Sequence, residues 1–171
     1  MRDATLTILI PVKNPKFLNE FIEENSEILN RYRVMVIDSG GGENLRPIST
    51  YYLKKNVSMA EARRIGIDLI TTPYTLNLDV DTILPEHYVE EAIGLIRGDV
   101  KVVALDYQKC QGHYAFGTSV WETATLKKLY SWSAIDSLCE CIRMWRRLIG
   151  ESKLKMETLP YRAIHLKGDS P

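Results

Sequence analysis

Short segments rich in hydrophobic residues alternate with longer segments of helical periodicity over residues 1–105 of the chain. Residues 6–12 form a continuous run rich in β-branched residues, which is typical of a strand buried on both faces of a sheet. The short segments predict strands at 6–12, 34–37, 51–54, 74–78 and 100–105. Amphipathic helices are predicted between Pro15 and Tyr32, Ser58 and Ile70, and Pro85 and Gly98. This alternation predicts an α/β fold with a mostly parallel sheet flanked by helices.

The second part of the chain, from about residue 106 to residue 171, has a less regular pattern. It predicts helices at 121–130 and 133–149, followed by short closing strands at 154–158 and 162–166. At 171 residues, the chain has about the length of one domain. We therefore expect a single domain over 1–171.

Composition excludes several classes of protein. Lys plus Arg is 22 and Asp plus Glu is 22, so the chain lacks the basic excess of a nucleic-acid binder. No stretch approaches the roughly 20 apolar residues of a membrane span, and the N-terminus does not match a signal peptide. The three cysteines have no regular spacing, which favours a reducing compartment. We expect a cytoplasmic protein that binds no nucleic acid.

Polar residues follow three of the predicted strands directly. They are Lys13 and Asn14, Asp38 and Ser39, and Asp79 and Asp81. In a parallel sheet, ligands bind at the carboxyl ends of the strands. These residues therefore mark the candidate site, and three carboxylates are expected at the same edge of the sheet.

The sequence Asp79-Val80-Asp81 places two carboxylates on one side of the chain if the chain is extended there. Two bare carboxylates repel each other, and a cation between them removes the repulsion. Mg²⁺ and Mn²⁺ prefer such hard oxygen ligands and leave coordination positions for phosphates. The alternative is a turn that simply contains two aspartates.

The segment Asp38-Ser39-Gly40-Gly41-Gly42 allows two interpretations. It could be a plain turn after a strand, because glycine tolerates positive φ. It could also let a flat base approach the backbone while Asp38 accepts hydrogen bonds from the base or the ribose. The spacing matches neither a dinucleotide-binding fingerprint nor a P-loop, which argues against hydride transfer and P-loop phosphotransfer.

Four motifs together carry a resemblance to a known family. They are residues 8–14 (Ile-Leu-Ile-Pro-Val-Lys-Asn), 36–40 (Val-Ile-Asp-Ser-Gly), 62–66 (Ala-Arg-Arg-Ile-Gly) and 76–81 (Leu-Asn-Leu-Asp-Val-Asp). In this order and at these intervals, they resemble the family 2 glycosyltransferases of the GT-A fold over about residues 4–100. The segment 160–168, with Ile164-His165, resembles the closing strand of that family. The chain would be a short, single-domain member.

The resemblance implies a nucleotide-diphosphate sugar, UDP- or GDP-linked, as donor and a hydroxyl group of a glycan, a lipid-linked molecule or a protein as acceptor. Residues 1–105 would bind the donor, and 106–171 would bind the acceptor and close the site. The nucleoside would contact Pro11, Lys13, Asn14 and Asp38, and Arg63 would approach the diphosphate. Asp79, Asp81 and His165 would hold Mn²⁺ or Mg²⁺, with Asp79 also near the ribose. Arg64 stands where the family has asparagine, and it either binds the diphosphate as well or faces solvent.

An inverting transferase needs a carboxylate that takes the proton of the acceptor hydroxyl. The family has an acidic pair in the region of 133–140, and here the candidates are Glu140 and Asp136. The structural alternatives are a capping role for Asp136 after Ser133 and a surface ion pair between Glu140 and Arg143.

Two further segments belong to the expected acceptor half. Gly117-Thr118-Ser119 resembles the family's glycine segment, and its hydroxyls would either meet the sugar or cap a helix. Residues 126–132 mix basic and aromatic side chains. They would either form a solvated charged face, which we favour, or make a weak contact with the inner face of a membrane.

Two other functions remain as alternatives to metal-dependent, inverting sugar transfer. A non-catalytic module or subunit that binds a nucleotide sugar would explain the short chain and the missing acidic pair. A sugar-1-phosphate nucleotidyltransferase would share the sheet and the metal, but Pro11-Val12-Lys13-Asn14 lacks the glycine-rich loop expected there.

Overall fold

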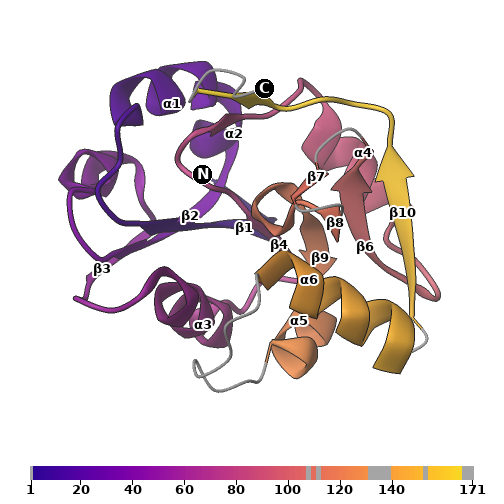
Figure 1. The fold of residues 1–171 in the computed structure, drawn as a ribbon. Coiled ribbons are helices and arrows are strands. Elements are labelled where there is room, and N and C mark those ends of the chain that lie inside the picture. Colours follow the sequence, from indigo (N-terminus) through magenta and orange to yellow (C-terminus); the bar gives the residue numbers. More distant parts are fainter. Residues whose placement is uncertain (1, 107–108, 111–112, 131–139, 152–153, 167–171) are drawn as a thin grey trace.

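The structure is a computed structural model of the chain, and it describes residues 2–106, 109–110, 113–130, 140–151 and 154–166. Seven strands form the central sheet in the order β10-β6-β9-β4-β1-β2-β3 (Figure 1). Their bounds are β1 Asp3–Val12, β2 Tyr32–Asp38, β3 Tyr51–Lys54, β4 Tyr74–Asn77, β6 Val100–Leu105, β9 Val120–Glu122 and β10 Lys155–Leu159. Only β9 runs antiparallel to its neighbours in this sheet, so the predicted mostly parallel α/β sheet is confirmed.

Helices cover both faces of the sheet. One face carries α1 (Leu18–Glu24), α2 (Ser26–Arg31) and α4 (Tyr88–Leu95), and the other carries α3 (Met59–Leu69), α5 (Thr123–Leu129) and α6 (Glu140–Arg146) (Figure 1). Two 3₁₀ segments, Glu43–Ile48 (η1) and Phe116–Thr118 (η2), and a π-helical turn at Arg147–Glu151 lie between or after these elements. Two short antiparallel pairs of strands complete the described fold, β5 (Thr82–Ile83) with β11 (Ile164–His165) and β7 (Lys109–Cys110) with β8 (His113–Tyr114).

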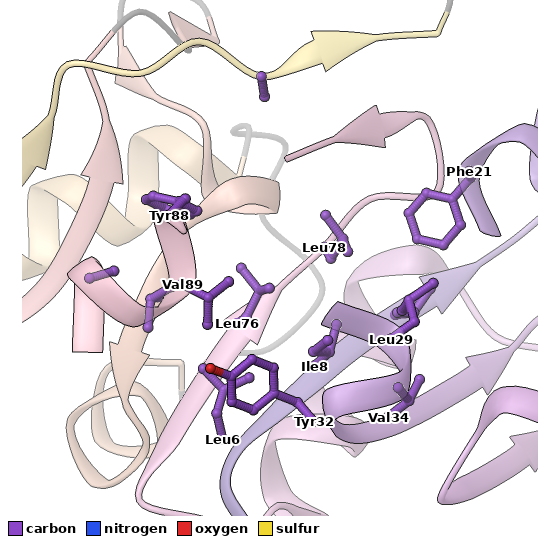
Figure 2. Close-up of a cluster of buried hydrophobic side chains, with 14 of the residues drawn as sticks. Leu6, Ile8, Phe21, Leu29, Tyr32, Val34, Leu76, Leu78, Tyr88 and Val89 are labelled. Carbon is purple, nitrogen blue, oxygen red and sulfur yellow. The ribbon is translucent and has the colours of Figure 1, made fainter. Parts of the chain in front are cut away.

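The three-layer arrangement explains why the run of residues 6–12 is hydrophobic at nearly every position. Ile8 and Ile10 of β1 pack with α1, α2 and α4, whereas Leu9 between them packs with α3 on the opposite face. Figure 2 shows the first of these two cores, in which Leu76 and Tyr88 also lie. Since successive strand residues point to opposite faces, both faces need apolar side chains.

The single helix predicted between Pro15 and Tyr32 is wrong in its bounds. The structure has two short helices that meet at Asn25, and α1 begins only at Leu18. Asn14, directly before the predicted start of this helix, adopts a left-handed conformation with φ of 50°. Asn25 is buried, and its amide donates to the carbonyl of Thr82 (2.9 Å) and accepts from the N–H of Leu84 (3.1 Å). The two helices meet at the residue whose amide binds the backbone of Thr82, in β5, and of Leu84, directly after β5.

Replacing Asn25 with alanine is expected to lower the free energy of unfolding by about 2–3 kcal/mol, because backbone groups of β5 lose their partners in a buried place. Urea unfolding measures this loss. Asn19→Ala, on an exposed position of α1, is the matched control and should change stability by no more than about 0.5 kcal/mol. Equal losses for the two variants would contradict a structural role for the Asn25 amide.

The helix predicted at 121–130 begins only at Thr123, because Trp121 lies in β9. This strand fills the space between β4 and β6, and the Trp121 ring is fully buried at 5.4 Å from the Trp145 ring. Trp145 is buried as well. Backbone pairing with two strands outweighs the local helical pattern at this position.

The other predicted boundaries shift less. The helix expected from Pro85 begins at Tyr88, after His87 with φ of 63°. Of the helix expected at 133–149, residues 133–139 lie outside the described part of the chain, and α6 covers the rest up to Arg146. Both closing strands are present as β10 and β11. No helix in the described ranges is long and apolar enough to cross a membrane.

Candidate functional site

A cavity of about 500 Å³ opens at the carboxyl ends of β1 and β4, beside the start of α3. Its lining residues are Lys13, Asn14, Pro15, Lys16, Phe17, Met59, Arg63, Asp79, Val80 and Asp81. Five of the residues singled out in the sequence therefore share one cavity. Pro11 does not line it, because Pro11 lies buried inside β1 opposite Ile37 of β2.

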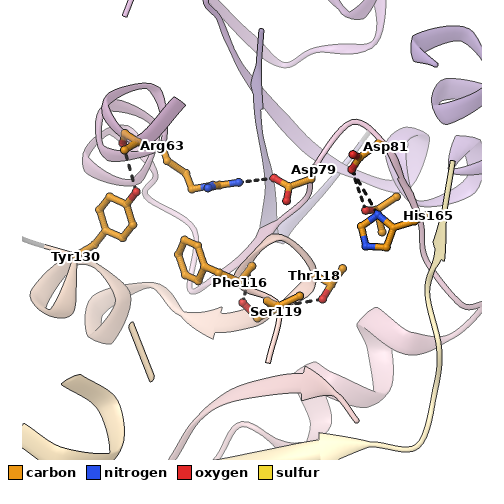
Figure 3. A network of polar contacts seen from close by, with 11 residues as sticks. Arg63, Asp79, Asp81, Phe116, Thr118, Ser119, Tyr130 and His165 are labelled. Carbon is orange, nitrogen blue, oxygen red and sulfur yellow. Dashed lines mark hydrogen bonds and ion pairs between the residues drawn. The ribbon is translucent and has the colours of Figure 1, made fainter. Parts of the chain in front are cut away.

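An ion pair between Arg63 and Asp79 lies at the centre of this site (Figure 3). The Arg63 side chain comes from α3 and is only 7% exposed, whereas that of Asp79 is 39% exposed. The guanidinium carbon also lies 5.5 Å from the centroid of the Phe116 ring. One Asp79 oxygen accepts from Arg63, and the other makes no hydrogen bond within the described ranges. Asp79 therefore keeps an oxygen that a ligand could use.

The backbone around Asp79 differs from the extended geometry that the sequence analysis assumed. β4 ends at Asn77, and the N–H of Thr82 donates to the carbonyl of Asp79 (3.2 Å), which closes a turn over 79–82. Both carboxylates still line the cavity, but Asp79 points toward Arg63 and Asp81 toward His165 (Figure 3). Convergence of the two aspartates thus comes from a turn rather than from strand alternation.

Gly117 of η2 approaches the Asp79 carboxylate so closely that a Cβ at position 117 would overlap it. The carbonyl of Gly117 also accepts from the N–H of Asp79 (3.1 Å). Only glycine permits both contacts at once. Gly117 of η2 therefore helps to place the Asp79 side chain, although the two residues lie far apart in the sequence.

Replacing Gly117 with alanine is expected to displace the Asp79 side chain and to weaken the binding of a nucleoside diphosphate by about tenfold, since a shift of a fraction of an ångström loses most of a charge-assisted hydrogen bond. Calorimetric titration with UDP and GDP in the presence of Mn²⁺ measures the effect. Gly94→Ala is the control, because a Cβ on that helix glycine of α4 meets no atom within 4 Å. Unchanged affinity in Gly117→Ala would contradict the role of this close approach.

His165 lies beside the second aspartate. Its Nδ1 is 3.8 Å from the Asp81 Oδ1, and the N–H of Leu166 donates to the carbonyl of Asp81 (2.8 Å). β11 and β5 thereby bring a residue near the C-terminus next to the aspartate turn. Within the described ranges, no group of three or more His, Cys, Asp or Glu side chains is close enough to hold a metal ion.

The Asp38 side chain lies at the same sheet edge but faces its own loop. It is fully buried, and its Oδ1 accepts from the N–H of Gly40 (2.7 Å) and of Gly42 (3.1 Å). Its Oδ2 accepts from the hydroxyl of Tyr52. These contacts support the turn alternative, in which positive φ at Gly40 and Gly41 requires glycine.

Arg64 faces away from the cavity. Its guanidinium binds Glu61 (2.6 Å) and Asp68 (3.0 Å) along the surface of α3. Of the two interpretations given above, the contacts support a solvent-exposed side chain that is paired on its own helix.

The hydroxyls of Thr118 and Ser119 are buried and used within their own segment. Ser119 donates to the carbonyl of Phe116 (2.7 Å) and accepts from the indole N–H of Trp121 (2.6 Å), and Thr118 donates to the carbonyl of Ala115 (3.3 Å). In the basic and aromatic segment, Leu126, Leu129 and Tyr130 are buried as well. These three side chains belong to the core, and residues 131–132 of the segment lie outside the described part of the chain.

The two candidates for the catalytic base cannot be placed. Asp136 lies outside the described residues, and Glu140 is described only as the first residue of α6. α6 packs against η2, the segment that carries Gly117.

Lys16, Phe17, Met59 and Phe116 are site residues that the sequence analysis missed. Lys16 had a signal, because it lies in the same strand-end loop as Lys13. The role of Phe116 depends on a contact with Arg63, which is 53 residues away in the sequence, and no local pattern reveals it.

Comparison with known proteins identifies the class of protein. The model of glycosyl transferase family 2 matches residues 7–146, so the chain belongs to this family and the resemblance noted in its motifs is confirmed. A search of the curated proteins finds no match.

Solved structures share the fold. Glucosyl-3-phosphoglycerate synthase from Mycobacterium tuberculosis has a TM-score of 0.66 and 14% identity, covering 98% of this chain and 73% of that chain. The 4-diphosphocytidyl-2C-methyl-D-erythritol synthase from Anaerococcus prevotii has a TM-score of 0.62 and 9% identity, covering 90% and 86%. For S. aureus TarS 1-349, the values are 0.54 and 12%, and the similarity covers 75% of this chain and 49% of that chain.

Because these identities are below 15%, the structural similarity establishes the GT-A-like fold and does not separate sugar transfer from nucleotidyl transfer. The match to glycosyl transferase family 2 favours sugar transfer over nucleotidyl transfer. It supports a transferase that uses a nucleotide sugar.

Proposed function

We propose that this protein transfers a sugar from a nucleotide-diphosphate sugar to a hydroxyl acceptor, with the donor bound in the cavity beside Arg63, Asp79 and Asp81. One observation carries the proposal. In a chain of family 2, a buried arginine and two aspartates line a single cavity at the carboxyl ends of the strands. This is the place where ligands bind in sheets of this kind.

The charges of the cavity suit a diphosphate. Three cationic side chains, Lys13, Lys16 and Arg63, face two carboxylates there. Neither lysine forms an ion pair with any other described residue, so both ammonium groups can compensate phosphate charge. Arg63 offers a planar fork of donors that matches phosphate oxygens. Lys13 and Asn14 would lie nearest the nucleoside, which leaves Asp38 to support the loop behind them.

The residues at the aspartate turn suit a hard divalent cation. Asp79 and Asp81 would hold Mn²⁺ or Mg²⁺ together with His165, since carboxylate oxygens and an imidazole are accepted ligands of such ions. Two observations support this set: one Asp79 oxygen makes no hydrogen bond within the described residues, and His165 lies beside Asp81. When bound, the ion would neutralise charge on the departing diphosphate. The role of the protein itself is to hold Arg63 and the two carboxylates at one wall of the cavity.

The acceptor half would supply the proton acceptor. We propose that Glu140 or Asp136 takes the proton of the acceptor hydroxyl while this hydroxyl attacks the anomeric carbon, which gives inversion. The packing of α6 against η2 supports a position near the site for the helix that begins at Glu140. Glu140→Gln and Asp136→Asn, each assayed for transfer and for donor binding, would identify the base as the residue whose loss abolishes transfer alone.

An assay of donor turnover separates an enzyme from a binding module. The protein is incubated with UDP- and GDP-linked hexoses and Mn²⁺, and release of UDP or GDP is followed over hours. We expect release by the wild type and none by Asp81→Asn. Asp99→Asn should retain the wild-type rate, because the Asp99 side chain is 77% exposed and Asp99 directly precedes β6, at the end of the sheet opposite the cavity. Donor binding without release from any of these sugars would favour the non-catalytic module.

A further inference from the structure

The ring of Phe116 supports the buried guanidinium of Arg63. The guanidinium carbon lies 5.5 Å from the ring centroid, and Phe116 itself is 1% exposed. Burying a guanidinium costs free energy unless its charge is compensated, and an aromatic face compensates part of it. Asp79 compensates charge from the cavity side. Phe116 therefore supports the one cavity arginine that is nearly closed off from water.

Phe116 is itself held on several sides. The Tyr130 ring is stacked on it at 5.7 Å and 14°, and the Trp121 ring meets it edge-on at 5.8 Å. The Tyr130 hydroxyl donates to the carbonyl of Ala60 (3.3 Å) in the first turn of α3, the helix that carries Arg63. Burial raises the pKa of Tyr130, which keeps this hydroxyl protonated as a donor.

The opposite side of the 3₁₀ turn is fixed by α4. The fully buried Tyr88 donates its hydroxyl to the carbonyl of Thr118 (2.7 Å). Arg63 of α3 thus pairs with Asp79, and Asp79 contacts Gly117 of η2. The neighbouring Phe116 stacks on Tyr130, which binds back to α3 through its hydroxyl (Figure 3). These contacts leave the Phe116 side chain little freedom to change its position.

We propose that Phe116 is a positioning residue of the donor site, which holds the Arg63 guanidinium at the cavity wall so that it can bind the diphosphate of the donor. This inference rests on the proposed function. It assigns to the acceptor half an indirect part in donor binding, because Phe116 does not line the cavity and acts through Arg63. Leucine at position 116 would keep most of the apolar packing but would lack the aromatic face.

Binding measurements with a matched substitution separate positioning from general packing. UDP, GDP, uridine and guanosine are titrated in the presence of Mn²⁺ into the wild type, Phe116→Leu and Phe21→Leu. Phe21 is equally buried but belongs to the core on the other face of the sheet. In Phe116→Leu, we expect affinity for the diphosphate that the wild type binds to fall about tenfold, with nucleoside affinity unchanged. Phe21→Leu should bind both as the wild type does.

Combination with Arg63→Ala, which leaves no cation for the ring to contact, tests whether Phe116 acts through Arg63. If it does, Phe116→Leu causes no further loss of diphosphate affinity in the Arg63→Ala background. Additive losses, equal losses of nucleoside and diphosphate affinity, or the same loss in Phe21→Leu would each overturn the proposal.

If neither UDP nor GDP binds, the proposed function is contradicted, but the role of Phe116 can still be tested by NMR without nucleotide. The guanidinium N–H signal that disappears from the nitrogen–proton NMR spectrum in Arg63→Lys belongs to Arg63. We expect this signal to be shifted by the Phe116 ring in the wild type and to move to the position of a solvent-exposed arginine in Phe116→Leu. An unchanged signal would overturn the positioning role.

Discussion

Replacing Asp38 with alanine is expected to lower the free energy of unfolding by about 3–5 kcal/mol, because three donors lose a buried acceptor at once. The carboxylate is fully buried and accepts from the N–H groups of Gly40 and Gly42 and from the Tyr52 hydroxyl. Burial, followed by the hydrogen bond to Asp38, raises the pKa of Tyr52, so this hydroxyl remains a donor at neutral pH. Denaturant unfolding measures the loss.

Two milder variants serve as controls for Asp38→Ala. Tyr52→Phe removes one of the three hydrogen bonds and should cost about 1 kcal/mol. Asp38→Asn keeps an acceptor oxygen for the loop and should fall between the other two variants. A loss below about 1 kcal/mol in Asp38→Ala, combined with lost nucleotide affinity, would contradict the structural role and would mark Asp38 as a carboxylate that binds the base.

Replacing Arg63 with alanine is expected to change two affinities in opposite directions. Affinity for a nucleoside diphosphate with Mn²⁺ should fall about 10- to 100-fold, since charge-assisted hydrogen bonds to the phosphates are lost. Affinity for Mn²⁺ alone should rise a few-fold, because Asp79 no longer pairs with Arg63. The second effect is small because the Asp79 side chain is 39% exposed, and solvent screens the ion pair. Calorimetric titration measures both.

Arg64→Ala is the matched control for Arg63→Ala. Arg64 is the next residue of the same helix, and it pairs with Glu61 and Asp68 on the surface rather than with the cavity residues. Both affinities should stay at the wild-type value. A weaker affinity for Mn²⁺ in Arg63→Ala, or an equal loss of nucleotide affinity in Arg64→Ala, would contradict the assigned role of the Arg63–Asp79 pair.

The sequence predicts the sheet well because its signal is local. The apolar run Leu6–Val12 lies in a strand that helices cover on both faces of the sheet, which explains why its side chains are apolar on both sides. The short β9 escapes prediction because Val120–Glu122 pairs with two distant strands in a segment that also has a helical pattern. The break at Asn25 escapes for the same reason, since its partners are the backbone groups of β5.

In the candidate site, too, the features with a local sequence signal are predictable and those that depend on distant segments are not. Residues that directly follow a strand, such as Lys13 and Asp79, are predictable at the edge of the sheet, and the structure brings them to one cavity. What each side chain contacts there depends on distant parts of the chain. Asp38 closes on its own loop and Tyr52, and Gly117 and Phe116 approach Asp79 and Arg63 from a segment more than 35 residues further along.

Calorimetric titration of the purified protein with UDP and with GDP, each with and without Mn²⁺, tests the central claim most directly. The proposed donor site predicts that one of the two nucleotides binds, that binding strengthens with Mn²⁺, and that it is lost in Asp79→Ala and Asp81→Ala while both variants remain folded. Absence of binding by the folded wild type, or binding that both variants retain, would contradict a donor site at this cavity.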